Sequence, residues 1–367
     1  MRLSCSQKDL ANALAITSKA VNTNNTLPVL NNVLLKAEGK KLYFTTTNLE
    51  VAISYWIETE VKNEGELTVP SRLFTNYINL LGKKDKVDIT AEEDSVLIKT
   101  DDSKTKIKGI PASEFPPIPP IEKEGGFSVE VKKLKEVIHQ VVFAAALNTT
   151  RPVLSGVYFR LLKDELKIAA TDSYRLSEKT IQVTDAAGDL KCIIPAKTMN
   201  ELGVILDTVD EKEKVEITIS KNQILFTIGA IRLTSRLVEG QFPNYEQIIP
   251  KSTKTEVSFN SSDYSLVLKR INIFAKENNN KIVLKTEGGK LKITTETTQY
   301  GEGEIFLETK ITGEENEIAL NSQFLLDVLM NMGDKEGVMK IGEKINPVII
   351  QPKDKEDYVH IIMPLKI

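Results

Sequence analysis

Residues 27–48 read LPVLNNVLLKAEGKKLYFTTTN, and the chain repeats this pattern at residues 151–172 as RPVLSGVYFRLLKDELKIAATD. A looser third copy, ENNNKIVLKTEGGKLKITTET, occupies residues 277–297. Each copy contains an apolar run, a polar turn and a second run in which apolar and polar residues alternate, which predicts a β-hairpin. Pro28 recurs as Pro152, and Asn48 has its counterpart in Asp172, both 124 residues later. The chain therefore contains three copies of one structural unit.

A helix is predicted on each side of every hairpin. The downstream helices are VPSRLFTNYINLL at residues 69–81, IPAKTMNELGVIL at 194–206 and LNSQFLLDVLMNM at 320–332. In the first we expect an inward face made of Leu73, Phe74, Tyr77, Ile78 and Leu81. Proline-rich linkers follow the first two copies, with Phe115-Pro116 matched by Phe242-Pro243. We predict an α+β chain with antiparallel sheets and three repeated domains, at residues 1–120, 127–245 and 254–367.

Composition narrows the class of protein. The 367 residues include 41% hydrophobic and 27% charged residues, and the net charge is -3. That hydrophobic content is enough for three cores, whereas the net charge does not reveal how charge is distributed over the surface. Cys5 and Cys192 are the only cysteines, so no disulfide framework is expected. No apolar run reaches transmembrane length and no signal-peptide core is present, which predicts a soluble cytoplasmic protein without membrane contact.

The sequence lacks the residue patterns of the common catalytic sites. His139 and His360 are the only histidines, and neither has a Cys, His or carboxylate neighbour at metal-ligand spacing. The EGGK stretch at Glu287 precedes a predicted strand and lacks the Ser or Thr of a phosphate-binding loop. We therefore expect no catalytic residues, no metal and no cofactor.

Several of these motifs are similar to those of a known family. TLPVLNNVLL from Thr26, RPVLSGVYF and ATDSYRLS in the second copy, EGQFPNY in the second linker and the terminal IIMPLKI resemble the bacterial sliding clamp, the beta subunit of DNA polymerase III. The resemblance spans the whole chain. It implies repeated DNA-clamp domains, three per chain, in a head-to-tail homodimer whose six domains close a ring around duplex DNA, with sheets outside and helices lining the hole. It also implies a non-catalytic processivity factor in DNA replication.

A clamp of this kind must hold double-stranded DNA without reading its sequence, so its contacts should be long cationic side chains that reach phosphates. Polar faces of the predicted helices supply such side chains from all three copies. Single lysines of this kind are usually solvated helix residues, and only their recurrence favours a DNA-facing role. The family often has an Arg before the TLP motif, where this chain has Asn24. The DNA-facing candidates are Lys8, Lys19, Arg72, Lys132, Lys135, Arg151, Lys197, Lys269 and Lys276.

The resemblance implies a second site, a groove that binds short peptides of the polymerase III alpha subunit, the clamp loader, other polymerases and repair proteins. Met363 and Leu365 beside Pro364 suit an adaptable groove, although a terminal run of this kind ordinarily becomes an edge strand. Tyr174 stands where the family commonly has His, which could narrow the pocket. The implied walls are Leu154, Thr171, Tyr174, Arg175, Leu176, Pro243, Gln247, Ile248, Asn321, Phe324, Ile345, Pro347, Ile361, Ile362, Met363, Pro364 and Leu365.

Ring closure in the family pairs edge strands of two chains. The matching positions here are Lys104, Thr105, Lys106, Ile107 and Lys108 in the first copy and Ile273 and Phe274 near the other side. An alternative remains open at the level of the sequence. The three copies could form an open protein-interaction scaffold that never encircles DNA.

Overall fold

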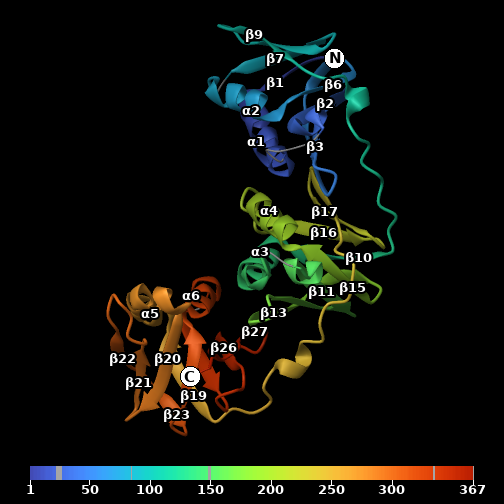
Figure 1. Ribbon diagram of the computed structural model, residues 1–367. Helices are drawn as coiled ribbons and strands as arrows, with labels where there is room; N and C mark the ends of the chain where they lie inside the picture. Colours follow the sequence, from blue (N-terminus) through green and yellow to red (C-terminus); the bar gives the residue numbers. More distant parts are fainter. Residues whose placement is uncertain (22–26, 84, 148–149, 334, 367) are drawn as a thin grey trace. The chain divides into compact units, whose positions relative to one another are not determined.

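The computed structural model describes residues 1–21, 27–83, 85–147, 150–333 and 335–366 (Figure 1). The chain forms two compact units. Unit 1 comprises Met1–Val131, Asp185–Ala187 and Val204–Leu237, and unit 2 comprises Lys132–Thr184, Gly188–Gly203 and Val238–Ile367. Among the described residues, no helix combines the length and the apolar character needed to cross a membrane.

Unit 1 contains two antiparallel sheets with helices α1 (Gln7–Thr17) and α2 (Ser71–Leu80). The five-stranded sheet has the order β5 (Glu60–Asn63), β1 (Arg2–Ser6), β7 (Lys86–Glu92), β8 (Ser95–Lys99) and β9 (Lys104–Lys108). The nine-stranded sheet has the order β14 (Thr184–Ala187), β10 (Gly125–Glu130), β16 (Lys214–Ile219), β17 (Gln223–Ile228), β18 (Ile231–Arg236), β4 (Val51–Glu58), β3 (Lys41–Thr47), β2 (Asn32–Glu38) and β6 (Gly65–Pro70). Short 3-10 helices are η1 (Ser18–Ala20), η2 (Pro28–Asn31) and η3 (Ala112–Glu114).

Unit 2 also contains two sheets. Its nine-stranded sheet has the order β15 (Leu190–Pro195), β11 (Gly156–Leu162), β12 (Glu165–Thr171), β13 (Arg175–Gln182), β27 (Tyr358–Ile362), β26 (Val348–Pro352), β25 (Glu336–Ile341), β19 (Thr255–Asn260) and β23 (Ile311–Gly313). The four-stranded sheet has the order β22 (Glu304–Glu308), β21 (Lys290–Thr294), β20 (Lys281–Glu287) and β24 (Glu317–Asn321).

The helices of the second and third copies occupy the predicted places. They are α3 (Val131–Val141) and α4 (Ala196–Leu206) in the second copy, and α5 (Ser261–Ala275) and α6 (Ser322–Asn331) in the third. The 3-10 helices are η4 (Val142–Ala144), η5 (Pro152–Ser155), η6 (Glu246–Ile248) and η7 (Lys276–Asn278). The repeated hairpins are β2–β3, β11–β12 and β20–β21, each paired antiparallel as their alternation predicted.

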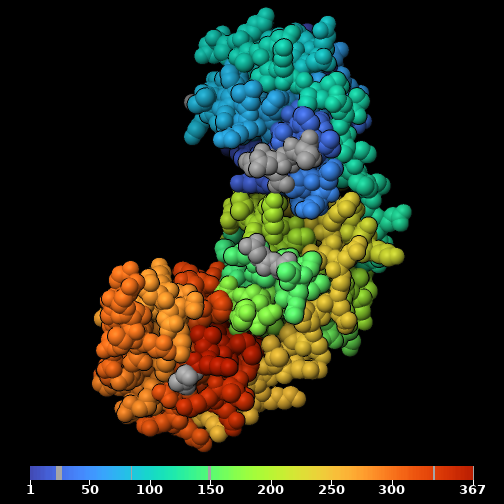
Figure 2. All heavy atoms as spheres, viewed as in Figure 1, coloured from blue at the N-terminus to red at the C-terminus, as the bar shows by residue number. Residues whose placement is uncertain are grey.

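Two strand pairings join consecutive copies, and we call each a joint. In the first joint β18 of the second copy pairs with β4 of the first, and Arg232 lies opposite Ser54. In the second joint β27 of the third copy pairs with β13 of the second, and Val359 lies opposite Glu178. Ser54 and Glu178 are equivalent positions 124 residues apart, so the two joints have the same register. In Figure 2 the red C-terminal residues accordingly lie against green residues of the second copy.

Packing within the first copy follows the helical periodicity with one exception. Phe74 and Ile78 of α2 are fully buried, and Tyr77 and Leu81 pack partly buried against the same core. Leu73 was expected to face inward, but 55% of it is exposed, so that prediction was wrong. The reason is angular: Leu73 lies one helical step, about 100°, from Phe74, and the inward stripe of an amphipathic helix is not much wider than that.

A buried histidine marks the second joint. His360 lies opposite Ser177 in the β27–β13 pairing and is fully buried. Its Nδ1 is 2.6 Å from the Ser177 hydroxyl, and its ring stacks on Phe143 with the centroids 5.4 Å apart. Burial, with a smaller contribution from Arg175, lowers the pKa of His360 to about 3. The imidazole is therefore neutral in the folded protein at neutral pH.

This histidine should make unit 2 less stable in acid. Below the ordinary histidine pKa, the imidazole of His360 binds a proton in the unfolded chain but stays neutral in the folded protein. The free energy of unfolding therefore falls as the pH drops from about 6.5 towards 3. Urea unfolding at pH 6.5 and pH 5 should show that His360→Asn removes about 1.5 kcal/mol of this loss. His139→Asn, at an exposed position, is the control and should leave the loss unchanged. An equal acid loss in the His360 variant would contradict the assignment.

Candidate functional site: an apolar groove beside the C-terminal strand

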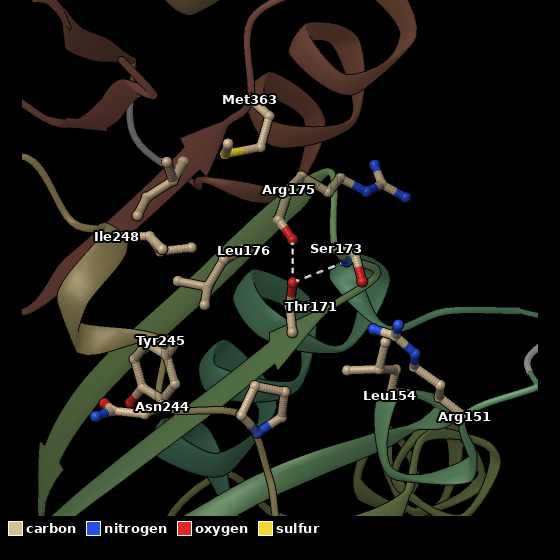
Figure 3. A pocket seen from close by; sticks show the side chains of 12 residues that line it. Arg151, Leu154, Thr171, Ser173, Arg175, Leu176, Asn244, Tyr245, Ile248 and Met363 are labelled. Atoms are coloured by element: carbon tan, nitrogen blue, oxygen red, sulfur yellow. Dashed lines mark hydrogen bonds between the residues drawn. The ribbon is translucent and has the colours of Figure 1, made fainter. Parts of the chain in front are cut away.

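A hollow of about 170 Å³ lies in unit 2 where the second copy, the second linker and strand β27 meet (Figure 3). Its lining is Arg151, Leu154, Thr171, Ser173, Arg175, Leu176, Pro243, Asn244, Tyr245, Ile248, Ile361 and Met363. Eight of these were predicted groove residues: Leu154, Thr171, Arg175, Leu176, Pro243, Ile248, Ile361 and Met363. The hollow is thus assembled from segments as far apart in the sequence as Arg151 and Met363.

Strand alternation builds the floor of the hollow. Leu176 of β13 lies directly opposite Ile361 of β27, and both side chains are 1% exposed within one apolar cluster. Ile248 lines the same hollow and is 41% exposed, so a ligand could still cover it. Successive side chains of a strand point to opposite faces, and Ile362 consequently enters the core of the third copy. The prediction that Ile362 forms a wall of the groove was therefore wrong.

A tight turn shapes one rim of the hollow. The Thr171 hydroxyl donates to the Arg175 carbonyl at 2.6 Å and accepts the Ser173 N–H at 3.1 Å, as Figure 3 shows. Asp172 Oδ1 accepts the N–H groups of Tyr174 and Arg175, each at 2.9 Å. Ser173 has a φ of 80°, a left-handed conformation that this network holds in place. The Met363 N–H donates to the Tyr174 carbonyl, so the turn also anchors the C-terminal segment.

Arg175 lines the hollow with its backbone side, while its guanidinium points away from it (Figure 3). That group forms ion pairs with Asp172 and with Asp327 of α6, and it donates to the Phe143 carbonyl at 3.0 Å. It also lies 4.6 Å from the centre of the Phe324 ring. Arg175 therefore connects the second and third copies, and Phe324 serves the same connection instead of lining the hollow.

An aromatic cluster supports the linker side of the hollow. The rings of Tyr158 and Phe242 stack with centroids 4.9 Å apart, and Tyr245 packs edge-on against both. The Tyr245 hydroxyl donates to Glu178, and burial together with that carboxylate strongly raises the pKa of Tyr245. Sequence reasoning missed Asn244 and Tyr245 as lining residues, although both belong to the EGQFPNY motif.

The remaining predicted groove residues lie outside the lining of this hollow. Asn321 caps α6 by accepting the N–H groups of Gln323 and Phe324, and the Leu365 N–H donates to the Ala319 carbonyl. Tyr174 and Ile345 are largely exposed, at 64% and 80%. Gln247, Pro347 and Pro364 likewise lie outside the lining.

Both predicted dimer segments are placed at surfaces. Strand β9 is the outermost strand of its sheet, with Lys104, Lys106 and Lys108 exposed and Ile107 turned into the core. Ile273 is 70% exposed and Phe274 is half-buried. Strand β22 is likewise outermost in its sheet, and its Phe306 is 54% exposed. The third copy thus carries an apolar surface next to an open sheet edge.

Comparison with known proteins decides the family. Models of the DNA polymerase III beta subunit match the chain in sequence: the N-terminal domain at residues 1–119, the central domain at 128–244 and the C-terminal domain at 246–366. The chain belongs to the bacterial beta sliding clamp family. The expected α+β architecture of three clamp domains with antiparallel sheets is thereby confirmed.

Relatives of this clamp cover its whole length. A beta sliding clamp of Synechocystis sp. is 29% identical, with 100% of both chains covered, and one of Staphylococcus epidermidis is 28% identical, with 97% of this chain and 96% of the relative covered. The crystal structure of the Pseudomonas aeruginosa beta subunit matches with a TM-score of 0.94 at 28% identity over 100% of both chains. A griselimycin-bound clamp of that organism matches at 0.96, with the same identity and coverage.

The cations proposed to face DNA in this clamp lie on or beside its helices. Lys8 and Lys19 belong to α1 and η1, Arg72 to α2, Lys132 and Lys135 to α3, Lys197 to α4, Lys269 to α5 and Lys276 to η7. All of these are exposed except Lys135, which is half-buried. Arg151 lines the hollow, and Asn24 lies outside the described residues. Among the described residues, no group of three His, Cys, Asp or Glu side chains could hold a metal ion.

Proposed function

We propose that two copies of this chain close head to tail into a ring around duplex DNA and display the apolar groove to partner peptides. As a beta sliding clamp it is a non-catalytic processivity subunit of DNA polymerase III. The main support for the ring is the strand pairing of the chain. Each chain contains two complete joints, β18–β4 and β27–β13, and two outermost strands, β9 and β22, that could form a third joint with a second copy.

The repeat specifies how the halves would meet. In the complete joints Arg232 faces Ser54 and Val359 faces Glu178. The equivalent positions on the open edges are Lys104 of β9 and Glu304 of β22, because Lys99↔Lys104 repeats Thr227↔Arg232, and Thr294↔Glu304 repeats Ala169↔Glu178. The same register places Lys106 opposite Glu302. Opposite charges thus face each other where a partner subunit's edge would pair.

Exposed apolar residues mark the same missing joint. Ile205 of α4 is 1% exposed and lines one hollow together with Ile16 of α1 at the first joint. Its equivalent in α2, Leu80, is 86% exposed. Phe143 packs against the core of the third copy in the second joint, whereas its equivalent in the third copy is Ile273, which is 70% exposed. A partner subunit would cover both of these surfaces, which supports the dimer segments proposed above.

Enclosure explains how such a ring could hold DNA yet slide. Sequence-independent binding needs cations near phosphates, and strong individual contacts would stop translocation. Long lysine side chains on helices of all three copies supply weak contacts of this kind. Glutamates are abundant on exposed strand edges such as β22, so an overall charge of -3 is compatible with a cationic inner face.

The groove is proposed to take short peptides of the polymerase III alpha subunit, the clamp loader, and other polymerase and repair proteins. An apolar floor made of Leu154, Leu176 and Ile361 would bury one apolar side chain of the peptide. The griselimycin complex of the Pseudomonas aeruginosa relative supports ligand binding by the family. We further propose three domains at residues 1–120, 127–245 and 254–367, cytoplasmic localisation, and no cofactor.

Exchanging the charges at Lys104 and Glu304 tests whether β9 and β22 pair between two copies of the chain. Lys104→Glu and Glu304→Lys should each weaken the dimer about tenfold or more, since like charges would meet in the joint. Combining the two in one chain should restore most of the affinity. Glu308→Lys is the control, because position 308 lies beyond the end of β9 in this register. Analytical ultracentrifugation supplies the readout, and a wild-type species at the chain mass of 40.9 kDa would favour the open scaffold instead.

A matched pair of isoleucines tests the groove. Ile248→Asp should weaken binding of a clamp-binding peptide by tenfold or more, because it places a charge in the apolar hollow. Ile345→Asp should have a smaller effect, since Ile345 lies outside that lining. Both side chains are exposed, so folding should survive each change. Fluorescence anisotropy with a labelled peptide measures the affinities, and an unchanged affinity for Ile248→Asp would exclude the hollow as the site.

A further inference from the structure

A second hollow, of about 300 Å³, lies in unit 1 at the first joint. Residues of α1, including Ala15 and Ile16, form one wall, and Val204 and Val209 from α4 and the turn after it form another. Tyr55 of β4 and Ile231 of β18 also line it. Lys19 is the only charged residue among its lining residues. The size is at the lower end of the range for small-molecule sites, about 300–1,000 Å³.

The second joint shows why this hollow exists. The positions equivalent to Ile16, Tyr55 and Ile231 are there occupied by three side chains that are at most 3% exposed: Gln140, Lys179 and Tyr358. Gln140 donates to the Met332 carbonyl at 2.7 Å. Lys179 pairs with Glu136 and Asp357 at 3.2 and 2.8 Å. Hydrogen-bonded Gln140 and Lys179 and the buried Tyr358 thus occupy the second joint, whereas two of the three positions in the first joint hold the shorter, apolar Ile16 and Ile231.

The position of Lys19 differs in the same way. Its equivalent in the second copy is Phe143, which packs into the core of the third copy and stacks on His360. An aromatic ring therefore fits the equivalent place of the repeated architecture, and in the first joint the chain supplies a cation instead. Burial, with added effects of Asp9 and Glu213, raises the pKa of Tyr55, so its hydroxyl remains a hydrogen-bond donor at neutral pH.

We propose that the hollow between α1 and α4 binds a small aromatic carboxylate. The ring would occupy the apolar space between Ile16 and Val204, and the carboxylate would pair with Lys19. Such a ligand would bridge two copies of the repeat and stiffen the first joint. The inference is independent of ring closure and of the peptide groove, because it concerns residues of unit 1 alone.

Indole-3-acetate is the probe, and uncharged indole-3-acetamide is its matched control. Calorimetry with the full-length chain should give a Kd of about 1 mM or tighter for indole-3-acetate. Lys19→Gln should weaken indole-3-acetate about threefold without affecting the acetamide. Lys8→Gln, on α1 but outside the lining, should change neither affinity.

The location is tested separately. Methyl signals of Ile16, Val204 and Val209 should shift on addition of indole-3-acetate, and Ala15→Trp should abolish both heat and shifts by filling the hollow. The methyl readout on the unmodified chain decides the matter if Ala15→Trp does not fold. The proposal is overturned if these signals stay in place at about 10 mM probe, or if Lys19→Gln leaves the preference for the carboxylate intact.

Discussion

The structure depends on the pairing of one repeat's last strand with an outer hairpin strand of the repeat before it. An open sheet edge exposes backbone donors and acceptors that can pair with another strand. A series of repeats must therefore add a further repeat, cover its last edge or pair its two end edges in a closed ring. Here β18 covers β4 and β27 covers β13 in the same register. β9 and β22 remain the outermost strands of their sheets. Opposite charges on β9 and β22, together with exposed apolar side chains nearby, would favour pairing of these two edges between two copies of the chain.

Ring closure would also explain how the chain could stay on DNA although its individual contacts with phosphates are expected to be weak. Its candidate cations are dispersed over seven helical elements, mostly as single exposed side chains. Such contacts are individually weak and screened by salt, which is a poor way to hold DNA by adhesion. A closed ring does not need adhesion, because dissociation then requires a joint to open. Arg175 lines the apolar hollow and also links the second and third copies through its ion pair with Asp327.

Much of this was predictable from the sequence. The hairpins, the helices after them and the linkers follow from alternation, helical spacing and a constant repeat distance, and they were found where predicted. Side-chain direction was harder. Ile361 and Ile362 look alike in the sequence, but only strand pairing shows that the first faces the groove and the second the core. Leu73 looked like core because its helical neighbours are, and the second role of Arg175, its ion pair with Asp327, could not be seen because that partner is 152 residues away.

The central claim is that this clamp holds DNA by enclosing it. The most direct test is to load the protein onto a nicked circular plasmid, remove free protein by gel filtration in high salt, and then linearise half of the sample. Enclosure predicts that the clamp stays on the circle for many minutes and leaves the linear molecule through its ends. Equal loss from circular and linear DNA would contradict the account.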